Sequence, residues 1–334
     1  MWCSAQPIRR PKARFDLTGS VPHRAKLQVM DDPALPGHAD LPVREGLPPG
    51  SSWGVWGDHD VFGTLNLLAP ERVVAAASAI RTGRTYGLDL ALTLPDPPLF
   101  GRSRLRHEVT SETNGVHDDL YHGWNTQSSS QWDGFRHMRH RDHGHYGGVP
   151  DAEHGVHHWA AHGIVGRAVL ADVARWRAEA GRPLRQGDDD PISADDLLAC
   201  LAAQGSRVET GDVLLLRTGY LSWYRELDRA GREAHAAAPR TPGLAGADVP
   251  RVLWDLHISA IAADNPAVEA IPPSRPFLHP VLLPLLGLPL GELWDLDALA
   301  DDCAAAGTYD AFLTSAPLNM PGGVASPPNA IAIR

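Results

Sequence analysis

Lysine is almost absent from this chain of 334 residues: among its 30 Lys and Arg residues, only Lys12 and Lys26 are lysines. The 40 Asp and Glu residues outnumber the basic ones and give a formal net charge of −10. A nucleic-acid-binding protein normally carries a basic face. The composition therefore predicts no nucleic-acid partner.

Cysteine and long apolar runs are also scarce. Cys3, Cys200 and Cys303 are an odd number with no paired spacing, which excludes a disulfide framework and a zinc–cysteine site and indicates a reducing compartment. No window approaches the run of about 18 apolar residues that a transmembrane helix needs. No apolar run follows the basic N-terminal residues, so we expect no signal peptide and a cytoplasmic protein.

Strand and helix patterns alternate over most of the chain. Residues 1–50 are rich in Pro and charged residues and predict an N-terminal arm, whereas 51–334 predict a single catalytic domain. Within that domain we predict strands near 85–93, 163–172, 211–220, 258–266 and 309–318. We predict helices at 70–83, 193–205 and 248–257, and a helical stretch interrupted by Pro and Gly at 280–307. Such alternation is typical of an α/β domain with a largely internal sheet.

The residues between 107 and 162 are unusual because they hold 11 of the chain's 17 histidines. No helical or strand period persists there, so we predict loops around short strands, where chemistry is often found. His143 and His145 are two residues apart and could chelate a metal, or they could belong to a solvated loop.

One stretch of this segment, residues 127–137, combines amide, carboxylate and imidazole groups. Gln127, Gln131, Asp133 and His137 are offset by 0, 4, 6 and 10 residues. Side chains two apart in an extended segment lie on the same face. Gln131 and Asp133 could therefore converge on one pocket together with His137.

This stretch resembles the signature H-x-G-T-H-x-D-x-P-x-H of the cyclase and kynurenine-formamidase-like hydrolase superfamily. Further segments resemble that family in the same order, at residues 53–73, 162–172, 211–220, 260–269 and 313–333. The resemblance implies a swivelling β/β/α-type α/β domain with mixed sheets and flanking helices. It also implies a homo-oligomer, a dimer or tetramer, in which the arm at 1–50 could embrace a neighbour.

The match also departs from the signature where the family binds a divalent metal. The two metal-binding histidines of the family fall on Gln127 and Gln131, the aspartate on Asp133 and the acid/base histidine on His137. An amide oxygen is a poor substitute for imidazole toward zinc. We therefore favour a site without a cofactor. Two alternatives stay open: Gln127, Gln131 and Asp133 could bind Mg²⁺, Mn²⁺ or Zn²⁺, or other histidines could rebuild a site elsewhere.

Several residues are candidates for catalysis or substrate binding. His137 would be the general acid/base, because imidazole titrates near neutral pH, and Asp133 would orient it; a purely structural histidine is the alternative. Asp264 and Asn265 end a predicted strand, where α/β proteins often bind ligands, although a simple turn explains them too. The substrate-binding set that we predict comprises Gln127, Gln131, Trp132, Trp124, Asp264, Asn265 and His279.

The expected function is that of a cyclase-family enzyme of secondary metabolism that acts on a small carbonyl-containing metabolite. Without a strong metal site, His137 and Asp133 would catalyse ring closure, dehydration or isomerisation by proton transfer. The first alternative is a metal-dependent hydrolase of an amide or lactone, and the second is a non-catalytic small-molecule binding protein.

Overall fold

The computed structural model describes residues 35–111, 115–273 and 276–334. Its centre is a nine-stranded mixed sheet in the order β1-β13-β11-β5-β7-β9-β10-β4-β12. In that order the strands are Thr85–Gly87, Ala330–Ile333, Asp310–Ser315, Ile164–Asp172, Val213–Arg217, Ala260–Ala263, Leu290–Glu292, Gln131–Asp133 and Ala325–Ser326. The expected α/β fold with a mixed sheet is confirmed.

The four central strands, β5, β7, β9 and β10, run parallel, and the outer pairs are antiparallel. Parallel strands covered on both faces read as continuous apolar runs, and Val213–Leu216 is such a run with every side chain buried. The strands predicted near 163–172, 211–220, 258–266 and 309–318 are thereby confirmed.

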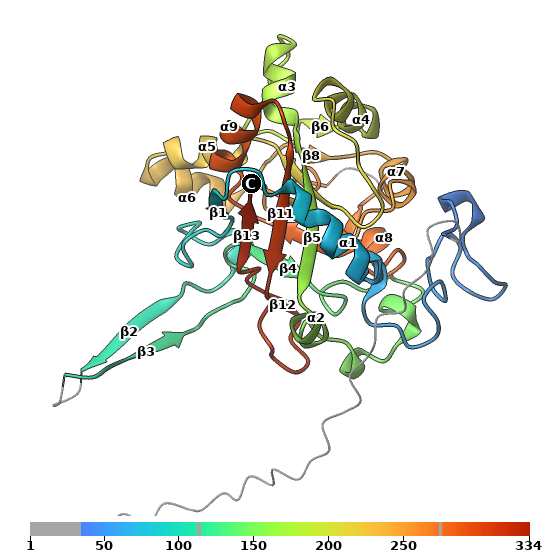
Figure 1. Cartoon of the computed structure of the whole chain (residues 1–334). Coiled ribbons are helices and arrows are strands. Elements are labelled where there is room, and N and C mark those ends of the chain that lie inside the picture. The colour runs from blue at the N-terminus through green and yellow to red at the C-terminus, as the bar shows by residue number, and fades with distance from the viewer. Residues whose placement is uncertain (1–34, 112–114, 274–275) are drawn as a thin grey trace, which may run out of the picture.

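Helices pack on this sheet, as Figure 1 shows for α1, which lies across β5. The helices are α1 (Pro70–Ala76), α2 (His157–His162), α3 (Val173–Glu179), α4 (Ala194–Ala203), α5 (Tyr220–Glu226), α6 (Arg229–Ala237), α7 (Val249–Asp255), α8 (His279–Leu282) and α9 (Asp297–Ala306). Helix α4 begins as predicted, because the Ser193 hydroxyl accepts a hydrogen bond from the Asp196 amide at 3.0 Å.

Three predicted elements are wrong in extent. The helix expected at 280–307 is instead α8, a loop, strand β10 and then α9. Its leucine-rich sequence resembles a helix, but Gly291 leaves no room for a Cβ beside Ala262 and the Trp294 ring, which suits a strand inside a sheet. The strand expected near 85–93 is limited to Thr85–Gly87, and helix α1 ends at Ala76 in a short 3₁₀ turn.

A long hairpin of β2 (Arg106–Ser111) and β3 (His117–His122) projects from the body of the molecule (Figure 1). A further small sheet joins β6 (Pro191–Ile192) to β8 (Gly243–Leu244). The histidine-rich segment therefore does contain short strands among its loops, as expected.

Most of the predicted N-terminal arm, residues 1–34, lies outside the described residues. The described remainder packs against its own chain: the Trp254 indole donates to the Pro36 carbonyl at 2.8 Å, and the His38 amide donates to Asp255 Oδ1 at 2.7 Å. Cys200 and Cys303 are buried and free. In the described ranges, no helix is long and apolar enough to cross a membrane.

Candidate active site

Strand β4 sets the orientation of the candidate site. Gln131 and Asp133 lie on one face of this strand and Trp132 on the other, where the Trp132 ring packs in the core against Trp294 at a centroid distance of 4.8 Å. All three residues of β4 are fully buried. The strand therefore presents an amide and a carboxylate together on the side away from the indole.

A tight turn after β4 brings His137 back toward Asp133. The His137 amide donates to the Gly134 carbonyl at 2.8 Å, which closes the turn. Only glycine fits at 134, because a Cβ there would lie 2.7 Å from the Val324 carbonyl oxygen. As a result, His137 Nε2 lies 3.5 Å from Asp133 Oδ2.

Gln127 ties the carboxylate to the imidazole. Its amide nitrogen donates to Asp133 Oδ1 at 2.7 Å and lies 2.9 Å from His137 Nδ1. Because one amide group reaches both acceptors, Nδ1 keeps a lone pair, and the proton of a neutral His137 ring sits on Nε2. Asp133 and His137, which the motif predicted to share one pocket, are therefore linked through Gln127.

His279, at the start of α8, brings a second imidazole to the site. Its Nε2 lies 3.9 Å from Asp133 Oδ2 and 3.1 Å from Glu292 Oε1, and its Nδ1 is hydrogen-bonded to Glu269 Oε1. Glu292 also accepts a hydrogen bond from the Gln131 amide group, across the β4–β10 pair. Phe277 stacks on the His279 ring at 5.4 Å.

Burial and charge change the pKa values of these groups. Burial, reinforced by the nearby charge of Glu292, raises the pKa of Asp133 to about 6. Burial lowers the pKa of His137, which therefore favours the neutral ring. Burial alone would lower the pKa of His279, but its hydrogen bonds to Glu269 and Glu292 outweigh that effect and raise the pKa to about 10.

Three side chains could hold a divalent cation. Asp133, His137 and His279 each offer one ligand atom, and these atoms lie within 4.8 Å of one another. Asp133 Oδ2 is buried and has no hydrogen-bond partner in the described structure. A carboxylate and an imidazole suit zinc or manganese, so Asp133 and His279 fit such an ion, and His137 joins them only through a nitrogen that carries no proton.

The prediction of a site without a cofactor is thus not confirmed, because His279 supplies an imidazole that the motif lacks. The amide nitrogens of Gln127 and Gln131 donate hydrogen bonds to neighbouring side chains, and Gln131 Oε1 is buried without a hydrogen-bond partner among the described residues. Elsewhere in the described ranges no further group of three ligating side chains is present, so His143 and His145 do not build one.

Other predicted substrate-binding residues lie away from this group. Trp124 follows the hairpin and contacts Tyr121 at 6.1 Å between ring centroids. Asn265 is fully buried and donates to the carbonyls of Pro242 and Glu269. Asp264 accepts hydrogen bonds from the Thr218 amide and hydroxyl and the Gly219 amide. Neither of these last two side chains has a hydrogen bond with Asp133 or His137.

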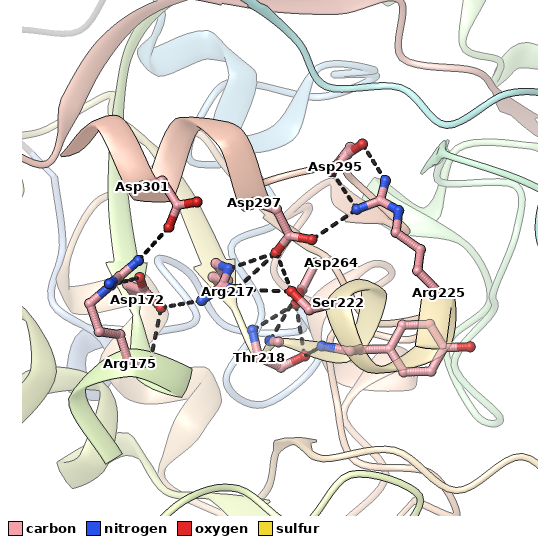
Figure 2. A network of polar contacts seen from close by, with 12 residues as sticks. Asp172, Arg175, Arg217, Thr218, Ser222, Arg225, Asp264, Asp295, Asp297 and Asp301 are labelled. Carbon is pink, nitrogen blue, oxygen red and sulfur yellow. Dashed lines mark hydrogen bonds and ion pairs between the residues drawn. The ribbon is translucent and has the colours of Figure 1, made fainter. Parts of the chain in front are cut away.

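Asp264 instead borders a polar network beside α9 (Figure 2). Arg217 is the centre of this network and forms ion pairs with Asp172 at 3.0 Å and with Asp297 at 2.9 Å. Arg175 and Arg225 extend it, toward Asp301 and Asp295 respectively.

Sequence reasoning missed the roles of Glu269 and Glu292. Glu269 was visible only as the end of a resembling segment, and Glu292 lay inside a stretch predicted to be helical. A strand assignment at 290–292 would have allowed Glu292 to lie in the sheet, where the structure pairs it with Gln131.

Comparison with known proteins agrees with the motif. The family model described as "Putative cyclase" matches residues 88–270. A crystal structure described as a novel cyclase is 34% identical in sequence to this chain and superposes with a TM-score of 0.76. The match covers 85% of this chain and 99% of the chain in that structure. No curated protein matches the sequence.

Two more distant structures share the fold. Isatin hydrolase A from Labrenzia aggregata, bound to benzyl benzoate, shares 21% identity with a TM-score of 0.55. The match covers 78% of this chain and 97% of that protein's chain. Isatin hydrolase A from Ralstonia solanacearum shares 19% identity with a TM-score of 0.56. The match covers 80% of this chain and 98% of that protein's chain. From the family model and the 34% identical relative, we conclude that this chain belongs to the cyclase family and is an enzyme of the cyclase/hydrolase superfamily.

Proposed function

We propose that this enzyme hydrolyses a cyclic amide or lactone in a small molecule, with a divalent cation held by Asp133 and His279 and with His137 beside the reacting bond. The observation that carries the proposal is Asp133 Oδ2, a buried carboxylate oxygen without a hydrogen-bond partner among the described residues. It lies 3.9 Å from one imidazole nitrogen and 3.5 Å from another.

The balance of charge supports a cation at this place. Asp133, Glu269 and Glu292 are all buried, and their ion pairs are with histidines alone in the described parts of the chain. Buried carboxylates without a compensating charge are strongly unfavourable. A divalent cation between Asp133 and His279 would offset this excess of negative charge.

His137 is the more accessible member of the group, because its side chain is 24% exposed and that of Asp133 is 1% exposed. A substrate therefore reaches His137 before it reaches the carboxylate. With Gln127 at Nδ1, His137 presents Nε2–H to the substrate. That N–H meets the negative charge that develops as the ring bond breaks.

The reaction is balanced by one water molecule. Its oxygen bonds to the acyl carbon, the ring C–N or C–O bond breaks, and the departing nitrogen or oxygen receives the proton that the water loses. A bound divalent ion would polarise the carbonyl group and lower the pKa of the attacking water. Asp133, buried and joined to His137 through Gln127, keeps that imidazole oriented toward the same point.

The test is ring opening with and without metal. Chelator-treated full-length protein is assayed on a panel of cyclic amides and lactones, including isatin because isatin hydrolases share this fold. We expect hydrolysis only after Mn²⁺ or Zn²⁺ is restored, and a loss of about 10²–10⁴-fold in turnover in His137→Ala. The control is His143→Ala, an exposed histidine of the same segment. Full activity of His137→Ala would sink the assignment.

A second candidate function is metal-free ring closure, dehydration or isomerisation by proton transfer. One observation favours it: both ring nitrogens of His279 face carboxylates, so the doubly protonated ring already supplies a cation. A proton or an ion can occupy Nε2, but not both. Turnover that survives complete removal of metal would select this candidate over hydrolysis.

From the family resemblance we also propose a homo-oligomer. Light scattering that gives the mass of a single chain would contradict this.

A further inference from the structure

Glu269 is hydrogen-bonded to His279 on the side that faces away from Asp133. Its Oε1 is hydrogen-bonded to His279 Nδ1 and accepts the His279 backbone amide at 3.2 Å, and its Oε2 accepts the Leu278 amide at 3.0 Å. The Glu269 residue is 2% exposed. One carboxylate thus fixes both the ring and the backbone at the start of α8.

The backbone next to this glutamate is in a conformation that its sequence disfavours. Val268 has φ of 58°, and the Glu269 amide donates to the Ala267 carbonyl across it. A positive φ is rare for a branched side chain, and a three-residue turn of this hand is strained. Such strain persists only where the surroundings enforce it, and it gathers at functional sites.

The second carboxylate that contacts His279 has the same kind of neighbour. Leu293 directly follows Glu292 and has φ of 56°. Each of the two glutamates in contact with the His279 ring is therefore adjacent in sequence to a left-handed residue other than glycine. A left-handed residue before Glu269 and another after Glu292 indicate that the backbone bends where these two carboxylates meet the one ring.

Neighbouring residues hold the Glu269 backbone in place. Strand β8 lies so close that a Cβ on Gly243 would overlap the Glu269 carbonyl group. The Asn265 amide donates to that carbonyl at 3.2 Å and to the Pro242 carbonyl at 2.8 Å. The geometry of this corner therefore depends on Gly243 and Asn265 as well as on Glu269 itself.

We propose that Glu269 is a positioning residue, which holds the Nδ1 edge of His279 so that Nε2 stays on the side of Asp133 and Glu292, and that the left-handed turn at Val268 serves to place it. A carboxylate that accepts the second ring N–H of a metal-binding histidine fixes the ring orientation and raises its basicity. This inference rests on the proposed function, because it concerns how His279 would bind the cation.

The main test measures metal binding rather than activity. Chelator-treated wild type and Glu269→Gln are titrated calorimetrically with Mn²⁺ alone and with Zn²⁺ alone. Glutamine keeps the shape of the side chain but removes its charge, so we expect binding about 10–100-fold weaker. We expect Glu269→Asp, which keeps the charge on a shorter side chain, to fall between the two. Equal affinity in wild type and Glu269→Gln would overturn the inference.

A second pair of variants keeps the proposal testable if Glu269→Gln does not fold. Val268→Ala removes the branch but keeps the strained φ, whereas Val268→Gly also relieves the strain. We expect the glycine variant to melt at a temperature equal to or above that of the alanine variant, although it has one carbon fewer. It should nevertheless bind the ion more weakly, because Glu269 is less firmly placed. The reverse order of affinity would contradict the proposal.

The outcomes separate this inference from the proposed function. Wild-type protein that binds the ion but opens no cyclic substrate would end the hydrolase proposal, and a weaker Glu269→Gln would still support the role of Glu269. Wild-type protein that binds neither ion would overturn both.

Discussion

The network around Arg217 and the candidate active site both bury carboxylates, but they compensate them differently. In the network, guanidinium groups from Arg175 and Arg217 meet Asp172, which is 1% exposed (Figure 2). In the candidate site, Asp133 is equally buried, yet within the described residues its only ion-pair partners are histidines at 3.5 Å and 3.9 Å.

Arginine remains charged at any pH the protein meets, whereas a histidine can lose its proton or exchange it for a metal. The network therefore has a fixed charge balance, which suits a structural role at the ends of β5 and β7. The charge balance of the candidate site can change with protonation or metal binding, which suits a catalytic role. Four measurements would break or sharpen this comparison.

The largest effect is expected for Asp133→Asn. Turnover should fall about 1000-fold or more, because the variant loses both a candidate cation ligand and the carboxylate bound to Gln127. The free energy of unfolding should stay within about 1 kcal/mol of wild type or rise, since a buried charge is removed. Steady-state kinetics and urea unfolding check both. Asp142→Asn, at an exposed aspartate nearby, is the control. Retained turnover would show that the site has been misassigned.

Arg217→Met should show the opposite pattern. It leaves Asp172 buried without its central guanidinium, and breaking such a pair costs about 3–5 kcal/mol of stability. Turnover per folded molecule should not change. Arg225→Met is the matched control, because its partners Asp295 and Asp297 are partly exposed. If both variants lost equal stability, burial would not be what distinguishes them.

Asp264 provides a pH test at the edge of the network. Burial raises its pKa from 3.8 to about 6, so the folded state binds this proton more tightly than the unfolded state does. Wild-type stability relative to Asp264→Asn should therefore fall as pH rises from about 4 to about 6, by on the order of 3 kcal/mol at most. Above and below that window the difference should be flat. Urea unfolding at a series of pH values measures it, and a difference that grows with pH would refute the assignment.

The smallest effect is expected at the rim of the network. Asp301 pairs with Arg175 at 2.6 Å, but its side chain is 76% exposed. Exposed pairs contribute little, so Asp301→Ala should change the free energy of unfolding by less than about 0.5 kcal/mol. A loss above about 1 kcal/mol in thermal or urea unfolding would mean that the network is cooperative out to its rim.

The sequence predicted the grouping of those candidate-site residues that are close together in the chain. Gln127, Gln131, Asp133 and His137 lie within one motif, and the strand and turn that join them follow local rules. His279 was predicted only as a substrate-binding residue, and its place beside Asp133 depends on α8 meeting β4 across more than a hundred residues.

The other differences between prediction and structure have a common physical origin. Glu292 reaches the site because β10 pairs with β4. The leucines around it predict a helix, and only the close contact of Gly291 with Ala262 in the folded sheet explains the strand. Trp132 belongs to the same motif as Asp133, but the pleat of a strand sends its ring to the opposite face, into contact with Trp294. The tertiary fold, and not the local sequence pattern, determines which face of β4 packs in the core and which faces the site.

Strand β4 is paired on both sides, with β10 and with β12. A shift of one residue in this strand would turn the indole of Trp132 toward His279 and send Gln131 and Asp133 into the apolar layer around Trp294. Adding or deleting one residue in the serine run at 128–130 would favour that shift. The backbone hydrogen bonds of β4 to β10 and β12 oppose it. The spacing of the motif therefore sets which side of the strand Gln131 and Asp133 occupy, and it keeps both on the side of His137 and His279.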